Sequence, residues 1–243
     1  MITRNPSLTD QVTSHIKHLI STEGFTEGRI PPETDLAADL GVSRTTVRDA
    51  LSRLEHEGAI YRRQGAGTFV NEHGLRIKSR LENIWSYEEL LENHGYEPSV
   101  RVLDVLQEPA DITTADALGI AHADPILVVE KLFLEDETPV VLTVNRIPVG
   151  NFSSPPPTGD EHNPVYAYLD AHCNRKLTYY LSEIIPVVLE PEQAATLQVD
   201  PGTPAMSFDE VGYDKDNEPI LRATSYFRDD LLRFRLIRKR MGT

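Results

Sequence analysis

Apolar residues recur at helical spacing in three short segments near the start of the chain. Between Ser43 and Gly58 they fall at i, i+3, i+4 and i+7, which is the spacing of one buried helical face. Residues 9–21 and 34–40 carry the same pattern. Ser43 suits the start of the third helix because its hydroxyl can accept a hydrogen bond from a free backbone N–H, and Gly58 suits its end. The pattern therefore predicts three helices before residue 59.

A glycine-tipped hairpin is expected directly after these helices, because residues 59–61 and 68–70 are strand-like. Gly41 permits a tight turn between the second and third helices, so the segments together predict a helix-turn-helix followed by a β-wing. Arginine side chains suit such a surface because they hold guanine or phosphate with two hydrogen bonds. The residues expected to contact DNA on this basis are Arg44, Thr45 and Arg48 in the third helix, and Arg62, Arg63, Gly65 and Gly67 in the wing.

The rest of the chain alternates between strand-like runs and short helical stretches. The strand-like runs are residues 100–106, 126–134, 140–147, 179–189, 205–213, 220–227 and 231–237. The helical stretches are residues 85–94, 113–118, 163–171 and 191–197. Charged turns between several of the runs are typical of antiparallel hairpins. An antiparallel sheet with segregated helices predicts an α+β domain.

Polar residues separate the two patterned regions. We expect a DNA-binding domain over residues 1–71, a linker over residues 72–79 and a second domain over residues 80–243. Near the C-terminus, residues 233–240 alternate apolar and basic side chains. That alternation favours an edge strand with a solvated basic face over a nucleic-acid-binding tail.

The formal net charge of −14 is unusual for a DNA-binding protein, but it is unevenly distributed. Residues 42–70 hold 5 basic and 3 acidic residues, whereas residues 74–243 hold 16 basic and 28 acidic residues. A local basic face can bind DNA while a distant acidic domain limits non-specific association. We therefore expect weak non-specific DNA binding with a strong dependence on salt.

Several functional classes find no support in the sequence. One cysteine, Cys173, excludes an internal disulfide and fits a reducing compartment. The chain has neither an apolar signal segment nor an apolar run long enough to span a membrane, so we expect a cytoplasmic protein. The eight histidines are scattered, without a nucleophile elbow, metal-ligand spacing or phosphate-binding loop. We expect no enzyme activity, no catalytic residue, no metal and no cofactor.

The segments VSRTTVRDAL, LEHEGAIYRRQGAGTFV and IPPETDLAADLGV closely resemble the winged helix-turn-helix of the GntR family of bacterial transcription regulators. The resemblance covers about residues 6–71. It implies that Ser43, Arg44, Thr45, Thr46 and Arg48 contact DNA, with the wing around Gln64–Gly67. One departure is Pro32, where the family usually has serine. Proline is tolerated at a helix start but offers no side-chain contact to phosphate.

The segments HGYEP, EKLFLEDETPVVLTVNRIP, NPVYAYL and DNEPILRATSYFRDD, over about residues 80–240, resemble a second domain known from this family. It is the effector-sensing UTRA domain of the HutC branch, which has a chorismate-lyase-like fold. The resemblance implies a small-molecule sensor and a homodimer formed largely through this domain.

The resemblance also implies an effector pocket, from which this chain departs. Sugar-phosphate-binding relatives use two arginines two residues apart, where this chain has Lys131 and Phe133. Two glutamates of the relatives become Thr143 and Leu221, and a tyrosine becomes Phe227. One cation in place of two favours a partly apolar metabolite with a single anionic group, such as a carboxylate, over a sugar phosphate. The implied pocket residues are Ser86, Lys131, Phe133, Thr143, Tyr166, Leu221 and Phe227.

The leading interpretation is a ligand-responsive transcriptional repressor. It would bind a palindromic operator in double-stranded DNA as a homodimer, and a metabolite would release it. The alternative is a DNA-binding or assembly module without a small-molecule effector. Enzyme activity is the third class considered, and only the resemblance to a lyase fold supports it.

Overall fold

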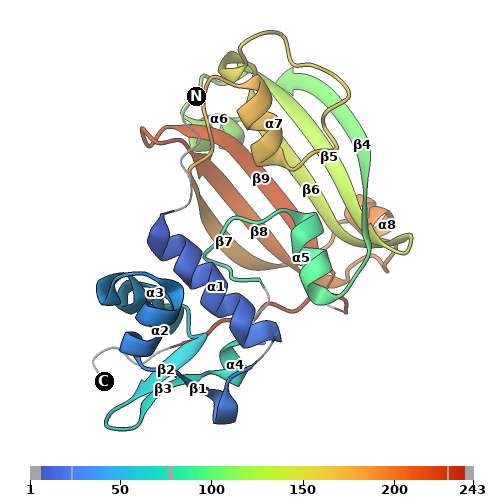
Figure 1. Cartoon of the computed structure of the whole chain (residues 1–243). Coiled ribbons are helices and arrows are strands. Elements are labelled where there is room, and N and C mark those ends of the chain that lie inside the picture. Colours follow the sequence, from blue (N-terminus) through green and yellow to red (C-terminus); the bar gives the residue numbers. More distant parts are fainter. Residues whose placement is uncertain (1–6, 23, 76–78, 229, 239–243) are drawn as a thin grey trace. The chain divides into compact units, whose positions relative to one another are not determined.

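The computed structural model describes residues 7–22, 24–75, 79–228 and 230–238 (Figure 1). It divides into two compact units: residues 1–78 together with 235–243, and residues 79–234. The expected linker over residues 72–79 is partly helical, because Glu72–Leu75 forms helix α4. None of the helices in the described ranges has the length and apolar character needed to span a bilayer.

The first unit is built on three helices: α1 (Leu8–Thr22), α2 (Glu33–Leu40) and α3 (Arg44–His56). Their apolar faces meet in one buried core, as the helical spacing predicts. This core includes Val12, Ile16, Ile20, Leu36, Val47, Ala50, Leu51 and Leu54. Gly41 ends α2 in a left-handed conformation with φ of 63°, and this turn directs the chain into α3.

The wing is a three-stranded sheet in the order β1-β3-β2, formed by β1 (Arg29–Ile30), β2 (Ile60–Arg63) and β3 (Gly67–Val70). The hairpin of β2 and β3 was predicted, whereas β1 was not. Two residues are too few to show the alternation that marks a strand. Helix α4 follows β3 directly, and the side-chain amide of Asn71 donates to the Gly58 carbonyl at 2.8 Å.

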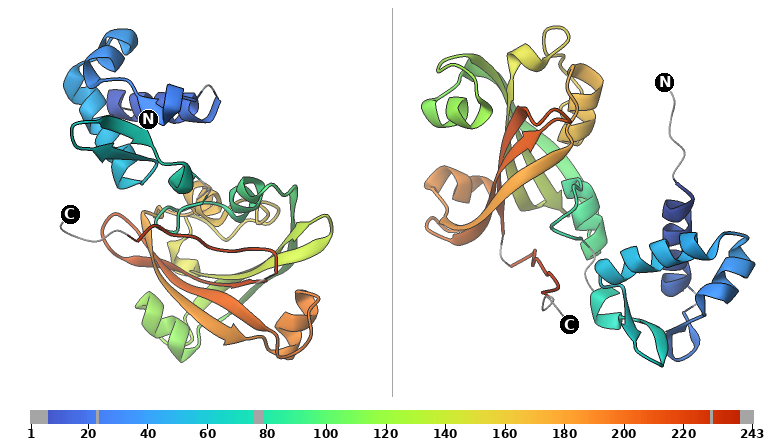
Figure 2. Two further views of the ribbon diagram at one scale, coloured as in Figure 1. Left: turned by 90° about the horizontal axis from the view of Figure 1, so that it is seen from below. Right: turned by 90° about the vertical axis from the view of Figure 1, so that its left-hand side faces the viewer.

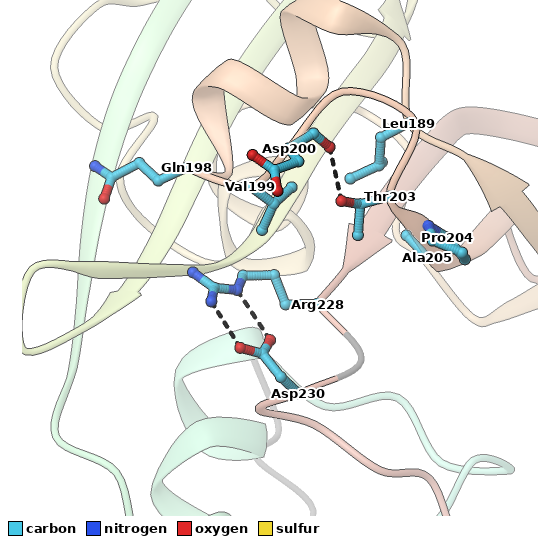
Figure 3. Close-up of a pocket in the computed structure, with 9 residues that line it drawn as sticks. All are labelled: Leu189, Gln198, Val199, Asp200, Thr203, Pro204, Ala205, Arg228 and Asp230. Atoms are coloured by element: carbon cyan, nitrogen blue, oxygen red, sulfur yellow. Dashed lines mark hydrogen bonds and ion pairs between the residues drawn. The ribbon is translucent and has the colours of Figure 1, made fainter.

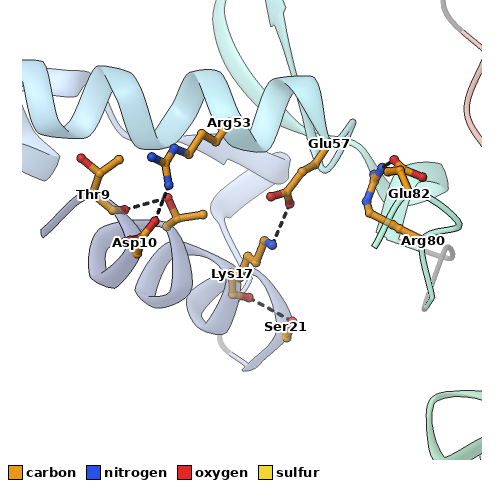
Figure 4. A network of polar contacts seen from close by, with 9 residues as sticks. Thr9, Asp10, Lys17, Ser21, Arg53, Glu57, Arg80 and Glu82 are labelled. Atoms are coloured by element: carbon orange, nitrogen blue, oxygen red, sulfur yellow. Dashed lines mark hydrogen bonds and ion pairs between the residues drawn. The ribbon is translucent and has the colours of Figure 1, made fainter. Parts of the chain in front are cut away.

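Ion pairs on the surface connect α1 to the C-terminal half of α3 (Figure 4). Lys17 Nζ lies 2.7 Å from a Glu57 carboxylate oxygen, and Arg53 pairs with Asp10. The Ser7 hydroxyl and the Arg53 guanidinium, in that order, lower the pKa of the Asp10 carboxyl. Exposed pairs of this kind add little stability, so the apolar core holds the helices together and the ion pairs refine their placement.

The second unit contains a six-stranded antiparallel sheet in the order β4-β5-β6-β9-β8-β7 (Figure 1). The strands are β4 (Pro98–Pro109), β5 (Pro125–Glu135), β6 (Thr138–Pro148), β7 (Tyr179–Val188), β8 (Pro204–Tyr213) and β9 (Pro219–Phe227). Six of the seven predicted strand-like runs are therefore strands. The winged helix-turn-helix and the antiparallel α+β domain are both confirmed.

Short helices cover both faces of this sheet (Figure 2). Helices α5 (Tyr87–His94) and α7 (Val165–His172) lie on one face, which we call the α5 face. Helices α6 (Ile112–Leu118) and α8 (Pro191–Thr196) lie on the opposite face. Alternate strand residues supply the two cores. In β5, for example, Phe133 packs with Leu90 and Leu91 of α5, whereas its neighbour Leu132 packs in a cluster with Ala194 of α8.

The strand expected at the C-terminus is not formed, because residues 231–238 have no regular secondary structure. After β9 ends, Leu232 and Phe234 join the core on the α5 face. The Phe234 ring lies 4.9 Å from that of Phe208 and stacks on Trp85 at 6.5 Å. The apolar residues of the alternating segment therefore pack onto the sheet instead of extending it. Residues 239–240, the end of the predicted strand, lie outside the described residues.

Candidate DNA-binding and effector sites

The first turn of α3 carries most of the helix residues predicted to contact DNA. Ser43 is the N-cap: its hydroxyl accepts a hydrogen bond from the Thr46 backbone N–H at 3.1 Å and lies 2.8 Å from the Thr46 hydroxyl. These two hydroxyls therefore order the start of the helix. Arg44 and Thr45 are exposed beside them. The structure thus leaves Arg44 and Thr45 open to a partner and uses Ser43 and Thr46 to hold them in place.

Glu33, at the first residue of α2, connects the recognition helix to the wing. Its carboxylate lies 3.2 Å from Arg48 Nε and 3.9 Å from a terminal nitrogen of Arg62. Arg62 also lies 3.4 Å from a carboxylate oxygen of Glu55 in α3. Two predicted DNA-contacting arginines are therefore engaged within the protein. A DNA phosphate would have to compete with these carboxylates, a constraint that the sequence analysis missed.

The rest of the wing is stiffened by aromatic packing. The rings of Tyr61 and Phe69 stack at 5.7 Å, and the Arg63 guanidinium lies 5.5 Å from the Phe69 ring centre. Arg63 nevertheless stays exposed, as do Gln64 and Gly65 at the turn. The wing thus presents a cation and backbone groups on a rigid base, which suits contacts to a DNA backbone.

We expect the substitution Gly67→Val to weaken binding to operator and non-operator DNA alike. Gly67 has a φ of +120°, which side-chain-bearing residues rarely adopt, and a Cβ there would lie 3.3 Å from Arg29 Nε. The wing turn would have to deform. Fluorescence anisotropy titrations with the two DNAs measure the effect, and Ala66→Val, one residue away, is the matched control. Affinities equal to those of the unsubstituted protein for both DNAs would remove this turn from the interface.

Five of the seven predicted effector residues lie in the sheet, on its α5 face. Lys131 in β5 is directly opposite Thr143 in β6, which is opposite Ser225 in β9. Phe133 and Phe227 belong to the core beside α5. Leu221 is also buried, but it packs in the neighbouring cluster beside α7. The predicted residues are thus divided between two apolar clusters, and the polar row of Lys131, Thr143 and Ser225 lies between these clusters.

Lys131 is buried beside polar and charged groups as well as beside apolar side chains. It is 3% exposed, and its Nζ donates to the backbone carbonyl of Asn163 at 2.7 Å. The Phe133 ring centre is 5.9 Å away. Burial lowers the pKa of Lys131 from 10.5 to about 8, against the opposing influence of the Glu88 and Glu161 carboxylates. The lysine therefore lies in a charged cluster that includes two acids.

Polar groups that the sequence analysis did not select complete this face. The Tyr87 hydroxyl lies 2.6 Å from the Ser225 hydroxyl. One carboxylate oxygen of Glu88 is buried and has no hydrogen-bond partner among the described residues. Burial raises the pKa of Glu210, which accepts a hydrogen bond from Ser182. These groups could have been found in the sequence as single polar residues within otherwise apolar strands. Asn145, which is 4% exposed, is an example.

The other two predicted effector residues have different surroundings. Ser86 is the N-cap of α5, and its hydroxyl accepts from the Glu89 backbone N–H at 3.0 Å. Tyr166, in the first turn of α7, is partly exposed. Tyr168 is the buried tyrosine of that helix, and it donates to the Pro157 carbonyl at 3.3 Å. The tyrosine implied by the resemblance, Tyr166, is therefore two residues away from the buried tyrosine, Tyr168.

A separate hollow of about 480 Å³ lies beside the C-terminal end of α8 (Figure 3). None of the predicted effector residues lines it. Its main charged group, Arg228, forms two hydrogen bonds with the Asp230 carboxylate and also donates to the backbone carbonyls of Pro139 and Leu197. Because these partners occupy the guanidinium, the hollow offers little to an anion, and the α5 face remains the better candidate for an effector.

Reactive chemistry is not apparent in the described residues. Burial raises the pKa of the Cys173 thiol to about 11, which keeps it neutral near pH 7. Within the described ranges, no three histidine, cysteine or carboxylate side chains gather in a group that could hold a metal ion. One candidate site thus presents exposed arginines, and the other contains a buried lysine close to two carboxylates.

Comparison with known proteins places both units in one family. Residues 8–70 match the model for bacterial regulatory proteins of the gntR family, and residues 93–233 match the model for the UTRA domain. The transcriptional repressor NagR of Bacillus subtilis is 26% identical over 207 residues, which cover 84% of this chain and 83% of NagR. The histidine utilization repressor of Pseudomonas putida is 27% identical, over 73% of this chain and 70% of that protein.

Solved structures show the same fold. The structure of PhnF from Mycobacterium smegmatis is 26% identical in sequence, with a TM-score of 0.60 over 94% of this chain and 99% of that one. The possible regulator YydK of Bacillus subtilis, at 17% identity, has a TM-score of 0.75 over 96% of this chain and 100% of that one. The resemblance found in the sequence is thereby confirmed: the chain is a transcriptional regulator of the GntR family, of the type that carries a UTRA domain.

Proposed function

We propose that the protein is a repressor that binds a palindromic operator as a homodimer and is released from it by a small-molecule metabolite. Relatives named as repressors, NagR and the histidine utilization repressor, align with it over most of their length. The exposed Arg44 and the adjacent wing support operator binding. The main support for a small-molecule effector is the charged cluster around the buried Lys131. Burying charged groups is costly, and a sheet face with a purely structural role would be more stable without them.

The groups of this cluster indicate the chemistry of the effector. In the described residues, Lys131 Nζ forms no ion pair and donates to one backbone carbonyl, while a buried oxygen of Glu88 has no partner. Buried ionised groups are costly unless they are paired. An effector with an anionic group for Lys131 and a hydrogen-bond donor for Glu88 would pair both. A small carboxylate that also carries an amino or hydroxyl group meets this description.

A sugar phosphate fits this cluster less well. Glu88 and Glu161 each interact electrostatically with Lys131, so the single cation already has two acidic neighbours. A phosphate would add about two more negative charges near pH 7. The carboxylate predicted from the sequence is therefore retained, now with a donor group in addition. The effector would shift the repressor towards an arrangement that no longer matches the operator half-sites. The size of this shift depends on how much more tightly the effector binds that arrangement than the DNA-binding one.

We expect Lys131→Met to abolish release from the operator by a cognate effector while leaving DNA binding intact. A thermal-shift screen of amino acids, hydroxy acids, simple carboxylates and sugar phosphates would identify the effector, because a ligand that binds the native state raises the melting temperature. Operator release is then measured against effector concentration in both proteins. Arg175→Met, which replaces a partly exposed cation in the same unit, is the matched control. An unchanged response in Lys131→Met would show that this lysine does not bind the effector.

The pH dependence of stability tests the buried charge independently of any ligand. The pKa of Lys131 is lowered in the folded protein, so its charge opposes folding fully below about pH 8. Between about 8 and 10.5 the unfolded chain binds the proton that the native state has lost, so stability rises with pH. Relative to Lys131→Met, the native protein should therefore gain stability across this window. Parallel pH profiles would contradict a buried, ionisable Lys131.

A further inference from the structure

The wing sheet carries an arginine, Arg29, in strand β1, which the sequence analysis did not predict. Arg29 is directly opposite Phe69 of the central strand β3, and Phe69 is opposite Tyr61 of β2 (Figure 1). Residues directly opposite one another in a sheet share a face, and so do residues two apart along a strand. Arg29, Tyr61, Arg63, Gly67 and Phe69 therefore share one face, which we call the outer wing face.

The opposite face of the wing sheet is turned to the apolar core of the unit. Ile30 and Ile60 are 2% and 1% exposed and belong to that core. Arg62 lies on the same side, where it meets the carboxylates of Glu33 and Glu55. The acids that engage a wing arginine are thus on the core side, and no carboxylate is among the five residues of the outer wing face.

The side chain of Arg29 extends from the edge of the sheet over the central strand. A Cβ added to Gly67 would lie 3.3 Å from Arg29 Nε and 3.6 Å from one of its terminal nitrogens. Arg63 approaches β3 from the other flanking strand. It is directly opposite Gly67, and its guanidinium lies 5.5 Å from the Phe69 ring centre. Two guanidinium groups therefore approach the same short stretch of β3, where glycine leaves room for them.

Neither guanidinium has an acidic partner among the described residues. The ion pairs of this unit involve other cations, and Glu27, two residues before Arg29, forms none with it. Both arginines are exposed. Like charges at neighbouring positions repel, and an anion bound between them removes that repulsion. Guanidinium groups also hold phosphate oxygens with two hydrogen bonds each, so the pair suits a phosphate that comes from outside the protein.

We infer that Arg29 and Arg63 together bind one phosphate of the DNA backbone. The inference rests on the proposed operator binding and adds to it a residue that lies outside both the recognition helix and the wing hairpin. Every DNA sequence presents phosphates, so this contact adds affinity without reading the sequence. The contacts predicted for α3 would supply the sequence reading, and the outer wing face would hold the backbone beside them.

Arg29→Met tests the inference, because it removes the charge and keeps a side chain of similar length. Dissociation constants are measured for operator and scrambled DNA over a range of potassium chloride concentrations. We expect both affinities to fall by the same factor, roughly 5- to 10-fold near 0.1 M salt, and the slope of log affinity against log salt to become shallower by about 1. Arg29→Lys should keep most of the slope. Arg53→Met, which removes a charge from the same unit, is the matched control.

Neutral phosphate analogues provide a second measurement that uses the native protein. A methylphosphonate is placed at each position of the operator in turn. The position that weakens binding of the native protein should have little effect on Arg29→Met or on Arg63→Met, because each variant already lacks part of the same contact.

Two results would overturn this inference while operator binding stands. One is an affinity and salt slope of Arg29→Met equal to those of Arg53→Met, or a loss confined to the operator. The other is the absence of any phosphate position whose effect both arginine variants remove. A native protein that binds operator no more tightly than scrambled DNA would instead overturn the proposed function.

Discussion

Replacing Arg44 by alanine should lower the affinity for operator DNA by about 1–3 kcal/mol, or roughly 5- to 150-fold, which is the usual contribution of one arginine that reads a base edge. Arg44 is exposed in the first turn of α3, where Ser43 caps the helix. Arg48→Ala should act in the same direction but less strongly, because Arg48 must first give up its contact with Glu33. Folding should be intact, since neither side chain belongs to the core.

Arg53→Ala is the matched control for these two variants. It removes the same charge from the same helix, but Arg53 lies near the C-terminal end of α3 and pairs with Asp10 of α1 (Figure 4). Titrations against operator and scrambled DNA should therefore separate Arg44 and Arg48 from Arg53. If neither Arg44→Ala nor Arg48→Ala weakens operator binding relative to Arg53→Ala, α3 is not the reading helix.

Gly74→Ala should destabilise the first unit by about 1–3 kcal/mol or more, which is the usual cost of forcing an extra methyl group into a packed site. An added Cβ would lie 1.9 Å from the Gly58 carbonyl oxygen and 2.9 Å from the Asn71 side-chain nitrogen. The nearest obstacle is backbone, so a side-chain rotation cannot relieve it. Helix α4 would have to move away from the turn after α3, and the hydrogen bond from Asn71 to Gly58 would be lost.

Thermal unfolding followed by circular dichroism measures this effect, with an expected fall in melting temperature of about 4 °C or more for a unit of this size. Gly150→Ala is the matched control, because nothing lies within 4 Å of a Cβ added there. A melting temperature of Gly74→Ala equal to that of the control would mean that α4 is not held against Gly58 in solution.

Local patterns predicted most of the fold. The helical spacing in the first 58 residues predicted α1 to α3 because each helix buries one continuous face. Six strands followed from alternation and from charged turns, which are properties of neighbouring residues. The C-terminal segment shows the limit of this reasoning. Its alternation is that of a strand, but Phe234 packs against Trp85 and Phe208, far away in the sequence, and no strand forms.

The candidate sites were less predictable because their partners come from distant segments. Arg44 and Arg48 could be selected from the exposed side of a single helix, whereas their competitor Glu33 belongs to another helix. In the second unit, Lys131 could be selected from a resemblance, but Glu88 and Glu161 become its neighbours through tertiary packing alone. The same applies to Tyr168, which only the packing of α7 distinguishes from Tyr166.

The position of Glu33 has a consequence for how quickly the protein searches a chromosome. A regulator spends most of its search on unrelated sequences, and its residence time there is set by contacts to phosphate. A carboxylate that holds Arg48 and Arg62 offers these arginines an internal substitute for phosphate, so unrelated DNA gains little by displacing it. At the operator, base contacts add to the phosphate contacts and outweigh the internal pair. We therefore expect Glu33 to shorten the time spent on unrelated DNA while base contacts keep the operator complex tight.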